Sequence, residues 1–105
     1  MGTHARRKPK RLAGKLLKIR RAFGDSQNGL IRRLDVEDQL SQSDLSAFER
    51  GTREPPLNVL LKYSELAQVW VNTLIDDAVD LPDRIPSNKM QGGIRKRISK
   101  RISRN

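Results

Sequence analysis

The chain has 105 residues, which is enough for one domain with a single small core and too few for two domains. It contains 22 Lys and Arg residues against 12 Asp and Glu residues, so its formal net charge is +10. Cysteine is absent and His4 is the single histidine. These counts exclude disulfide frameworks and thiolate metal sites and argue against Ser–His or Cys–His nucleophiles. We therefore expect no enzymatic activity, no metal site and no cofactor.

Membrane insertion is also not expected. No apolar run approaches the roughly 20 residues of a membrane span, and no signal-peptide core follows the N-terminal charges. The composition therefore favours a cytoplasmic protein with a polyanionic partner and no membrane contact.

The positive charge is concentrated at the two ends of the chain. Residues 1–21 contain nine bases and residues 87–105 contain seven, and neither segment contains an acid. All 12 acids fall within residues 22–86, together with six bases. Charged ends either keep a small protein soluble or bind phosphates through Coulomb attraction and counterion release. We favour phosphate binding.

The first two helices are expected within residues 10–34, after a flexible basic arm over residues 1–9. From Lys10 onward, apolar side chains recur at helical spacing, and Gly24 is placed to end that helix. Ser26 is placed to cap a second helix. The side chains expected to face the core are Leu12, Leu16, Ile19 and Phe23 in the first helix and Leu30, Ile31 and Leu34 in the second.

Three further helices are expected after a polar, acidic stretch at residues 35–39. Ser41 and Asp44 match the capping-box pattern for a helix from Gln42 to about Arg50, which Gly51 ends. Its expected core residues are Leu45 and Phe48. A fourth helix follows Pro55 and Pro56 and is marked by Leu57, Leu60, Leu61, Ser64 and Ala67. A fifth covers roughly residues 71–77, and its apolar residues are Leu74 and Ile75. Prolines at 82 and 86 exclude a helix there.

Residues 40–62 resemble the helix-turn-helix domain of the phage repressors and Cro, often called the XRE type. The stretch contains a serine cap at Ser41, the Glu49–Arg50–Gly51 triplet, a short basic loop, Pro55 and the Leu57-x-x-Leu60-Leu61 pattern. The resemblance extends from about residue 12 to residue 75. It implies an all-α, five-helix repressor-like domain over residues 10–77, with the basic arm before it and an irregular linker and basic tail over residues 78–105.

The resemblance implies that the helix over residues 42–50 reads DNA. A major groove admits one helix, and the first turn of that helix reaches the base edges. The small polar residues Gln42, Ser43 and Ser46 suit this position, and Gln42 is able to form a bidentate pair with adenine. By family position Ala47 also faces the groove, where its methyl group would touch a thymine methyl group.

Phosphate contacts are expected from two other places. Gln27 and Asn28 lie at the N-terminus of the second helix, where free N–H groups favour an anion. Thr52 and Arg53 lie, by family position, in the loop after the reading helix. Arg50 either joins them or is simply solvated.

Two structural contacts follow from the same resemblance. The family's pattern pairs Arg20, four residues before Gly24, with Glu49. Domains of this type often dimerise through their last helix, so the candidate dimer contacts are Trp70, Val71, Leu74 and Ile75. Trp70 has an alternative interpretation as a lid over the core.

The connection before the reading helix departs from the family. Residues 35–39 stand where one glycine is usual, so either the second helix continues for a turn or a loop bulges out. The added acids would be repelled by phosphate. We therefore expect this segment to point away from the DNA backbone or to set an unusual docking angle.

These observations predict a sequence-specific DNA-binding transcriptional regulator in the cytoplasm, associated with the nucleoid. It would bind double-stranded DNA as a homodimer, with no small-molecule ligand. One alternative is an antitoxin-like or accessory protein-interaction module with secondary DNA binding. A second is a basic protein that associates with a membrane or with RNA through its tail. In this tail Lys96–Ser99 is repeated as Lys100–Ser103.

Overall fold

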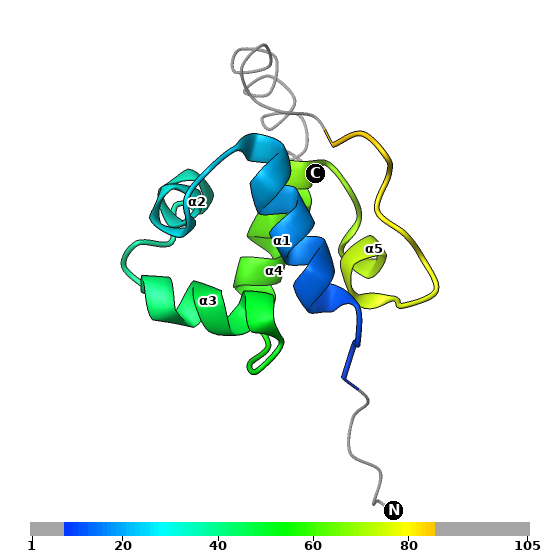
Figure 1. Ribbon diagram of the computed structural model, residues 1–105, viewed down its shortest axis with the longest axis horizontal. Helices are drawn as coiled ribbons and strands as arrows, with labels where there is room; N and C mark the ends of the chain where they lie inside the picture. The colour runs from blue at the N-terminus through cyan, green and yellow to red at the C-terminus, as the bar shows by residue number, and fades with distance from the viewer. Residues whose placement is uncertain (1–7, 86–105) are drawn as a thin grey trace, which may run out of the picture.

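The computed structural model describes residues 8–85, and this range contains five helices and no strand. They are α1 (Leu12–Phe23), α2 (Gln27–Leu34), α3 (Gln42–Arg50), α4 (Leu57–Ala67) and α5 (Val71–Ile75). In Figure 1, α1 and α4 lie at the centre, α2 and α3 lie on one side of them, and α5 lies on the other. The expected helical class and the positions of the five helices are confirmed, whereas most of the arm and nearly all of the basic tail lie outside the described residues.

The helix ends follow local signals in the sequence. Gly24 and Gly51 end α1 and α3 in the left-handed conformation, with φ of 70° and 79°, which glycine adopts without a steric penalty. The hydroxyl group of Ser26 accepts a hydrogen bond from the Gly29 N–H at 2.9 Å. Ser41 and Asp44 form the expected capping box at the start of α3. These caps fix where α2 and α3 begin.

Every helix contributes side chains to one apolar core. The largest fully buried ones are Leu16 and Ile19 of α1, Leu30 of α2, Leu45 and Phe48 of α3, Val59 and Tyr63 of α4, and Leu74 of α5. Burial of each aliphatic or phenyl side chain stabilises the fold by about 1.5–3 kcal/mol. The core therefore holds α3 against α1 and α2 along its inner face and leaves its outer face to solvent.

The buried face of α4 includes only part of the pattern that marked this helix in the sequence. Leu57 and Leu61 are 81% and 48% exposed, whereas Leu60, Ser64 and Ala67 are buried. Val59, Tyr63 and Leu66 also pack inward. These three recur at spacings of four and three, so they form a single helical stripe turned away from Leu57 and Leu61.

The connection between α2 and α3 is a packed turn. Helix α2 ends at Leu34, with Asp35 in the left-handed conformation at φ 62°, so the helix does not continue for another turn. The segment does not bulge out either, because Val36 and Leu40 are only 2% and 7% exposed. Paired hydrogen bonds of 3.2 and 2.8 Å join the side-chain amides of Gln39 and Asn58. The added residues are thus anchored at the start of α4.

The segment after α5 is irregular and packs against the helices. Leu81 and Ile85 are 6% and 8% exposed and belong to the core cluster. The Asp77 carboxylate accepts hydrogen bonds from the backbone N–H groups of Lys10 and Arg11, both at 2.9 Å. Packing therefore extends past residue 77, where the helical domain was expected to end, at least to Ile85.

Candidate nucleic-acid interface

The N-terminal ends of α2 and α3 lie next to each other. The Nε2 atom of Gln42, the first residue of α3, donates a hydrogen bond of 3.1 Å to Oε1 of Gln27, the first residue of α2. Gln42 and Ser43 are exposed, as is Asn28 beside Gln27. The structure therefore brings two expected base-reading residues together with two expected phosphate-binding residues on one surface.

Arg20 and Glu49 form the ion pair expected between α1 and α3. The two carboxylate oxygens of Glu49 accept hydrogen bonds from Nε and Nη2 of Arg20 at 2.7 and 3.0 Å. Their side chains are 20% and 5% exposed. The hydrogen bond with Glu49 is the main cause that raises the pKa of Arg20. The pair thus holds the two helices together within a partly desolvated contact.

The same carboxylate also holds the surface glutamines. Oε1 of Glu49 accepts a hydrogen bond of 3.0 Å from Nε2 of Gln27, whose own Oε1 accepts from Gln42. Arg20, Glu49, Gln27 and Gln42 form a continuous polar chain from the helix packing to the surface. The Arg20–Glu49 pair was expected, but the links from Glu49 to Gln27 and from Gln27 to Gln42 were not, because no local signal joins these positions.

The exposed face of α3 is narrower than expected. Ser46 is half-buried, and its hydroxyl group accepts a hydrogen bond of 2.8 Å from Nη1 of Arg50. Ala47 is only 6% exposed, which leaves its methyl group little surface for the expected contact with a base. The loop after α3 folds back onto Ala47, because the N–H groups of Thr52 and Arg53 both donate to its carbonyl oxygen. Gln42, Ser43 and Ser46 are the remaining base-reading candidates.

Arg53 is held against α3. Its Nη1 lies 2.6 Å from Oδ1 of Asp44, and its guanidinium group lies over the Phe48 ring, 5.4 Å from the ring centroid. Hydrogen bonds from the Ser41 backbone, and next from Arg53, lower the pKa of Asp44. Asp44 therefore stays ionised at neutral pH and fixes the direction of a guanidinium group that is 54% exposed.

Helix α5 presents only part of the expected dimer surface. Trp70 is 81% exposed and Ile75 is 41% exposed, so the interpretation of Trp70 as a lid over the core is wrong. Val71 is half-buried. Leu74 is fully buried in its own chain, which removes it from the candidate dimer contacts. Trp70, Val71 and Ile75 remain.

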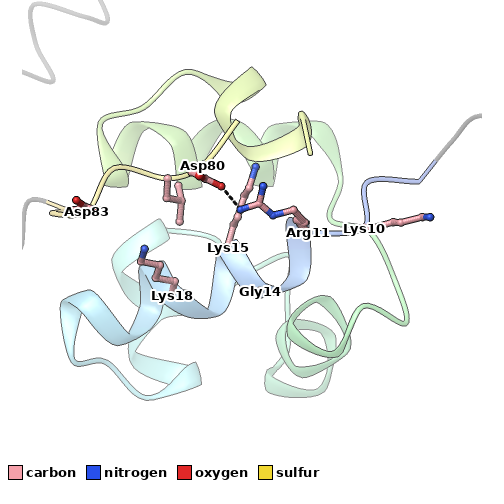
Figure 2. Close-up of a pocket in the computed structure, with 8 residues that line it drawn as sticks. Lys10, Arg11, Gly14, Lys15, Lys18, Asp80 and Asp83 are labelled. Atoms are coloured by element: carbon pink, nitrogen blue, oxygen red, sulfur yellow. Dashed lines mark hydrogen bonds and ion pairs between the residues drawn. The ribbon is translucent and has the colours of Figure 1, made fainter. Parts of the chain in front are cut away.

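A hollow of about 440 Å³ lies where the segment after α5 meets α1. Figure 2 shows Arg11 directed at Asp80, with which it forms an ion pair, and Lys18 and Asp83 near the edge. The ammonium group of Lys15 donates to the carbonyl oxygens of Thr73, Asp76 and Val79 at 2.6–2.9 Å. Burial lowers the pKa of Lys15, and the three carbonyl acceptors favour its charged form. Arg11 and Lys15 therefore join the C-terminal segment to α1.

No helix within residues 8–85 has the length and apolar character needed to cross a membrane. The same part of the chain contains no group of three or more His, Cys, Asp or Glu side chains arranged to hold a metal ion. Comparison with protein-family models, curated proteins and solved structures finds no match for this chain.

Proposed function

We propose that the chain is a sequence-specific DNA-binding transcriptional regulator of the phage-repressor, XRE type, and that α3 reads the major groove. The observation that carries the proposal is the hydrogen bond between Gln42 and Gln27. It joins the first residues of two capped helices, so both N-termini open on one exposed polar surface. This arrangement suits a duplex, because one helix N-terminus reaches bases while the other meets phosphates.

The free hydrogen-bonding groups of Gln42 support adenine as its target. A side-chain amide has two N–H donors and one carbonyl acceptor. In the free chain, one donor of Gln42 is used by Gln27. The second N–H and the carbonyl oxygen remain, and these are the groups that pair with N7 and N6 of adenine. Gln42 therefore keeps its contact with Gln27 while it binds a base.

The remaining contacts divide between reading and positioning. We assign Ser43 and Ser46 to the bases because they share the exposed face of α3 with Gln42. The groups assigned to phosphates are Gln27 and Asn28 at the start of α2 and Arg50, Thr52 and Arg53 at the end of α3. Phosphate contacts fix the position of α3 without reading sequence. Dimerisation through Trp70, Val71 and Ile75 would present two reading helices to a palindromic site.

Selection of duplexes from a random pool at about 0.15 M salt tests the proposal, because specific binding exceeds non-specific binding by roughly 10³-fold or more at such salt. The expected result is an enriched palindrome with half-sites about one helical turn apart. A pool that shows no enriched sequence after repeated rounds would contradict it.

The exposed apolar side chains favour one alternative, a module that binds another protein. Trp70 and Leu57 are each 81% exposed, and aromatic residues such as Trp are enriched in protein–protein interfaces. This alternative predicts a stoichiometric complex with a partner protein and an affinity for duplexes that ignores their sequence. The two functions are therefore distinguished by the same selection experiment.

A further inference from the structure

A second hollow lies between the segment that leads into α1 and the end of α3. Its volume is about 380 Å³. Residues 8–10, 12 and 13 line one side, and Phe48 with residues 50, 51, 53 and 54 lines the other. A Cβ atom at Gly51 would lie 3.5 Å from the Cβ of Ala13, so the two sides are in close contact at that point. We call this feature the basic hollow.

The lining of the basic hollow is mainly positive. It contains four bases, Lys8, Lys10, Arg50 and Arg53, and one acid, Glu54. Within residues 8–85, the ammonium groups of Lys8 and Lys10 have no ion-pair partner. Both residues are exposed. The hollow therefore presents two ammonium groups, those of Lys8 and Lys10, that form no ion pair with a carboxylate of residues 8–85.

The two sides of the basic hollow are held in place before any ligand binds. The backbone N–H of Lys10 is fixed by the carboxylate of Asp77 at 2.9 Å. On the opposite side, Arg53 is fixed by Asp44 and by the Phe48 ring. The guanidinium group of Arg53 is therefore oriented before a ligand binds, which lowers the conformational entropy lost on binding.

We infer that the basic hollow binds a backbone phosphate of the DNA strand that flanks α3, with Lys8 and Lys10 on one side and Arg50 and Arg53 on the other. The inference rests on the proposed function. A phosphate of the DNA backbone reaches the end of α3 only if α3 lies in the major groove. It adds the segment before α1 to the interface. It also gives the positive charge of residues 8–10 a defined position beside the loop residues, in place of a diffuse attraction.

The test compares two doubly substituted chains that each lose two positive charges. Lys8→Ala/Lys10→Ala removes one side of the basic hollow. Lys18→Ala/Arg84→Ala is the matched control, because both residues are exposed and neither lines this hollow. Affinity for a selected duplex and for its scrambled version is measured by fluorescence anisotropy between 50 and 200 mM salt.

Because each phosphate contact contributes about 0.9 to the slope of log affinity against log salt, the slope for Lys8→Ala/Lys10→Ala should become shallower by about 1. The ratio between the selected and scrambled duplexes should stay unchanged. Duplexes with a single neutral methylphosphonate linkage then locate the contact. One linkage in each half-site should weaken the wild-type chain more than the Lys8→Ala/Lys10→Ala chain, in which only Arg50 and Arg53 still face that phosphate.

The inference is overturned if Lys8→Ala/Lys10→Ala keeps the wild-type slope, or if the control loses as much slope. It is also overturned if every methylphosphonate affects both chains alike. These results leave the proposed function intact as long as the wild-type chain still prefers the selected duplex. Equal binding of selected and scrambled duplexes by the wild-type chain would instead contradict the proposed function, and the inference with it.

Discussion

At the scale of single residues, Glu49 connects the packing of the helices to the proposed reading surface. One carboxylate receives two hydrogen bonds from Arg20 and one from Gln27. Gln27 in turn orients the amide of Gln42. A change at Arg20 is thus expected to affect both the stability of the fold and the orientation of the glutamines.

Replacement Arg20→Met should lower the free energy of unfolding by about 3 kcal/mol, because it leaves a largely buried carboxylate without its counterion. Denaturant-induced unfolding measures this loss. Arg32→Met is the matched control, since Arg32 is exposed on α2 and substitutions at such positions usually change stability by no more than about 0.5 kcal/mol. Equal losses in the two variants would show that the Arg20–Glu49 pair makes no special contribution.

At the scale of elements, the sequence predicted the helix ends, because these depend on neighbouring residues in the chain. The helix ends at Gly24, Ser26, Ser41 and Gly51 depend on residues within one turn, so capping rules located them. Burial depends on which elements meet in three dimensions. That is why the leucine pattern of the fourth helix did not reveal that Leu60 is buried while Leu57 is exposed. It is also why the packing of Val36 and Leu40 in an acidic stretch was not foreseen.

The candidate site shows the same division between local and long-range information. The family resemblance located Gln42, Gln27, Arg20 and Glu49, and the structure joins them in one chain of contacts. The resemblance also indicated Ala47, which is only 6% exposed and whose carbonyl oxygen accepts hydrogen bonds from the loop after α3. No pattern of neighbouring residues predicts how that loop folds back. None predicts that Lys8 and Lys10 line the same hollow as Arg53.

The C-terminal segment gives an element-scale prediction about the core. Leu81→Ala should lower the free energy of unfolding by about 2–5 kcal/mol, because Leu81 is buried and its truncation leaves a cavity. Leu57→Ala removes the same atoms from an exposed position and should cost less than about 0.5 kcal/mol. Thermal or denaturant unfolding of both variants measures the difference. If Leu81→Ala is as stable as Leu57→Ala, the segment after α5 is not part of the core.

The same segment also predicts a pH dependence. Hydrogen bonds from the backbone N–H groups of Lys10 and Arg11 lower the pKa of Asp77 below its ordinary value of 3.8. A lowered carboxyl pKa stabilises the fold at pH values above that ordinary value, and the contribution is lost as the pH falls through the pKa of the folded state. The wild-type chain should therefore be more stable than Asp77→Asn at pH 7.

Measurements of the melting temperature between pH 2 and pH 7 check this prediction. The difference between the wild-type chain and Asp77→Asn should shrink in strong acid, where the carboxyl group is protonated. A difference that is the same at all pH values would contradict the assigned role of Asp77.

At the scale of the whole molecule, charge and selectivity lie in different parts of the chain. The excess of positive charge lies in residues 1–21 and 87–105, while residues 22–86 contain twice as many acids as bases. The proposed reading residues Gln42, Ser43 and Ser46 are neutral. Affinity for DNA in general and preference for one sequence are therefore expected to depend on different residues.

Removal of residues 87–105 tests this separation. The seven bases of that segment should add affinity for all duplexes alike, because counterion release does not depend on sequence. The shortened chain should bind more weakly, with a shallower salt dependence and an unchanged ratio between selected and scrambled duplexes. If its duplex binding disappears while circular dichroism shows an intact helical fold, the proposed role of α3 is contradicted.

The central claim is that α3 reads bases through Gln42, and the most direct measurement is the preference of Gln42→Ala at each base pair of the selected site. We predict that this variant loses about 1–3 kcal/mol of discrimination at one base pair per half-site and keeps the wild-type preference elsewhere. Gln68→Asn, an exposed change at the end of α4, should leave every preference unchanged. A Gln42→Ala chain with the full wild-type preference at every position would contradict the claim.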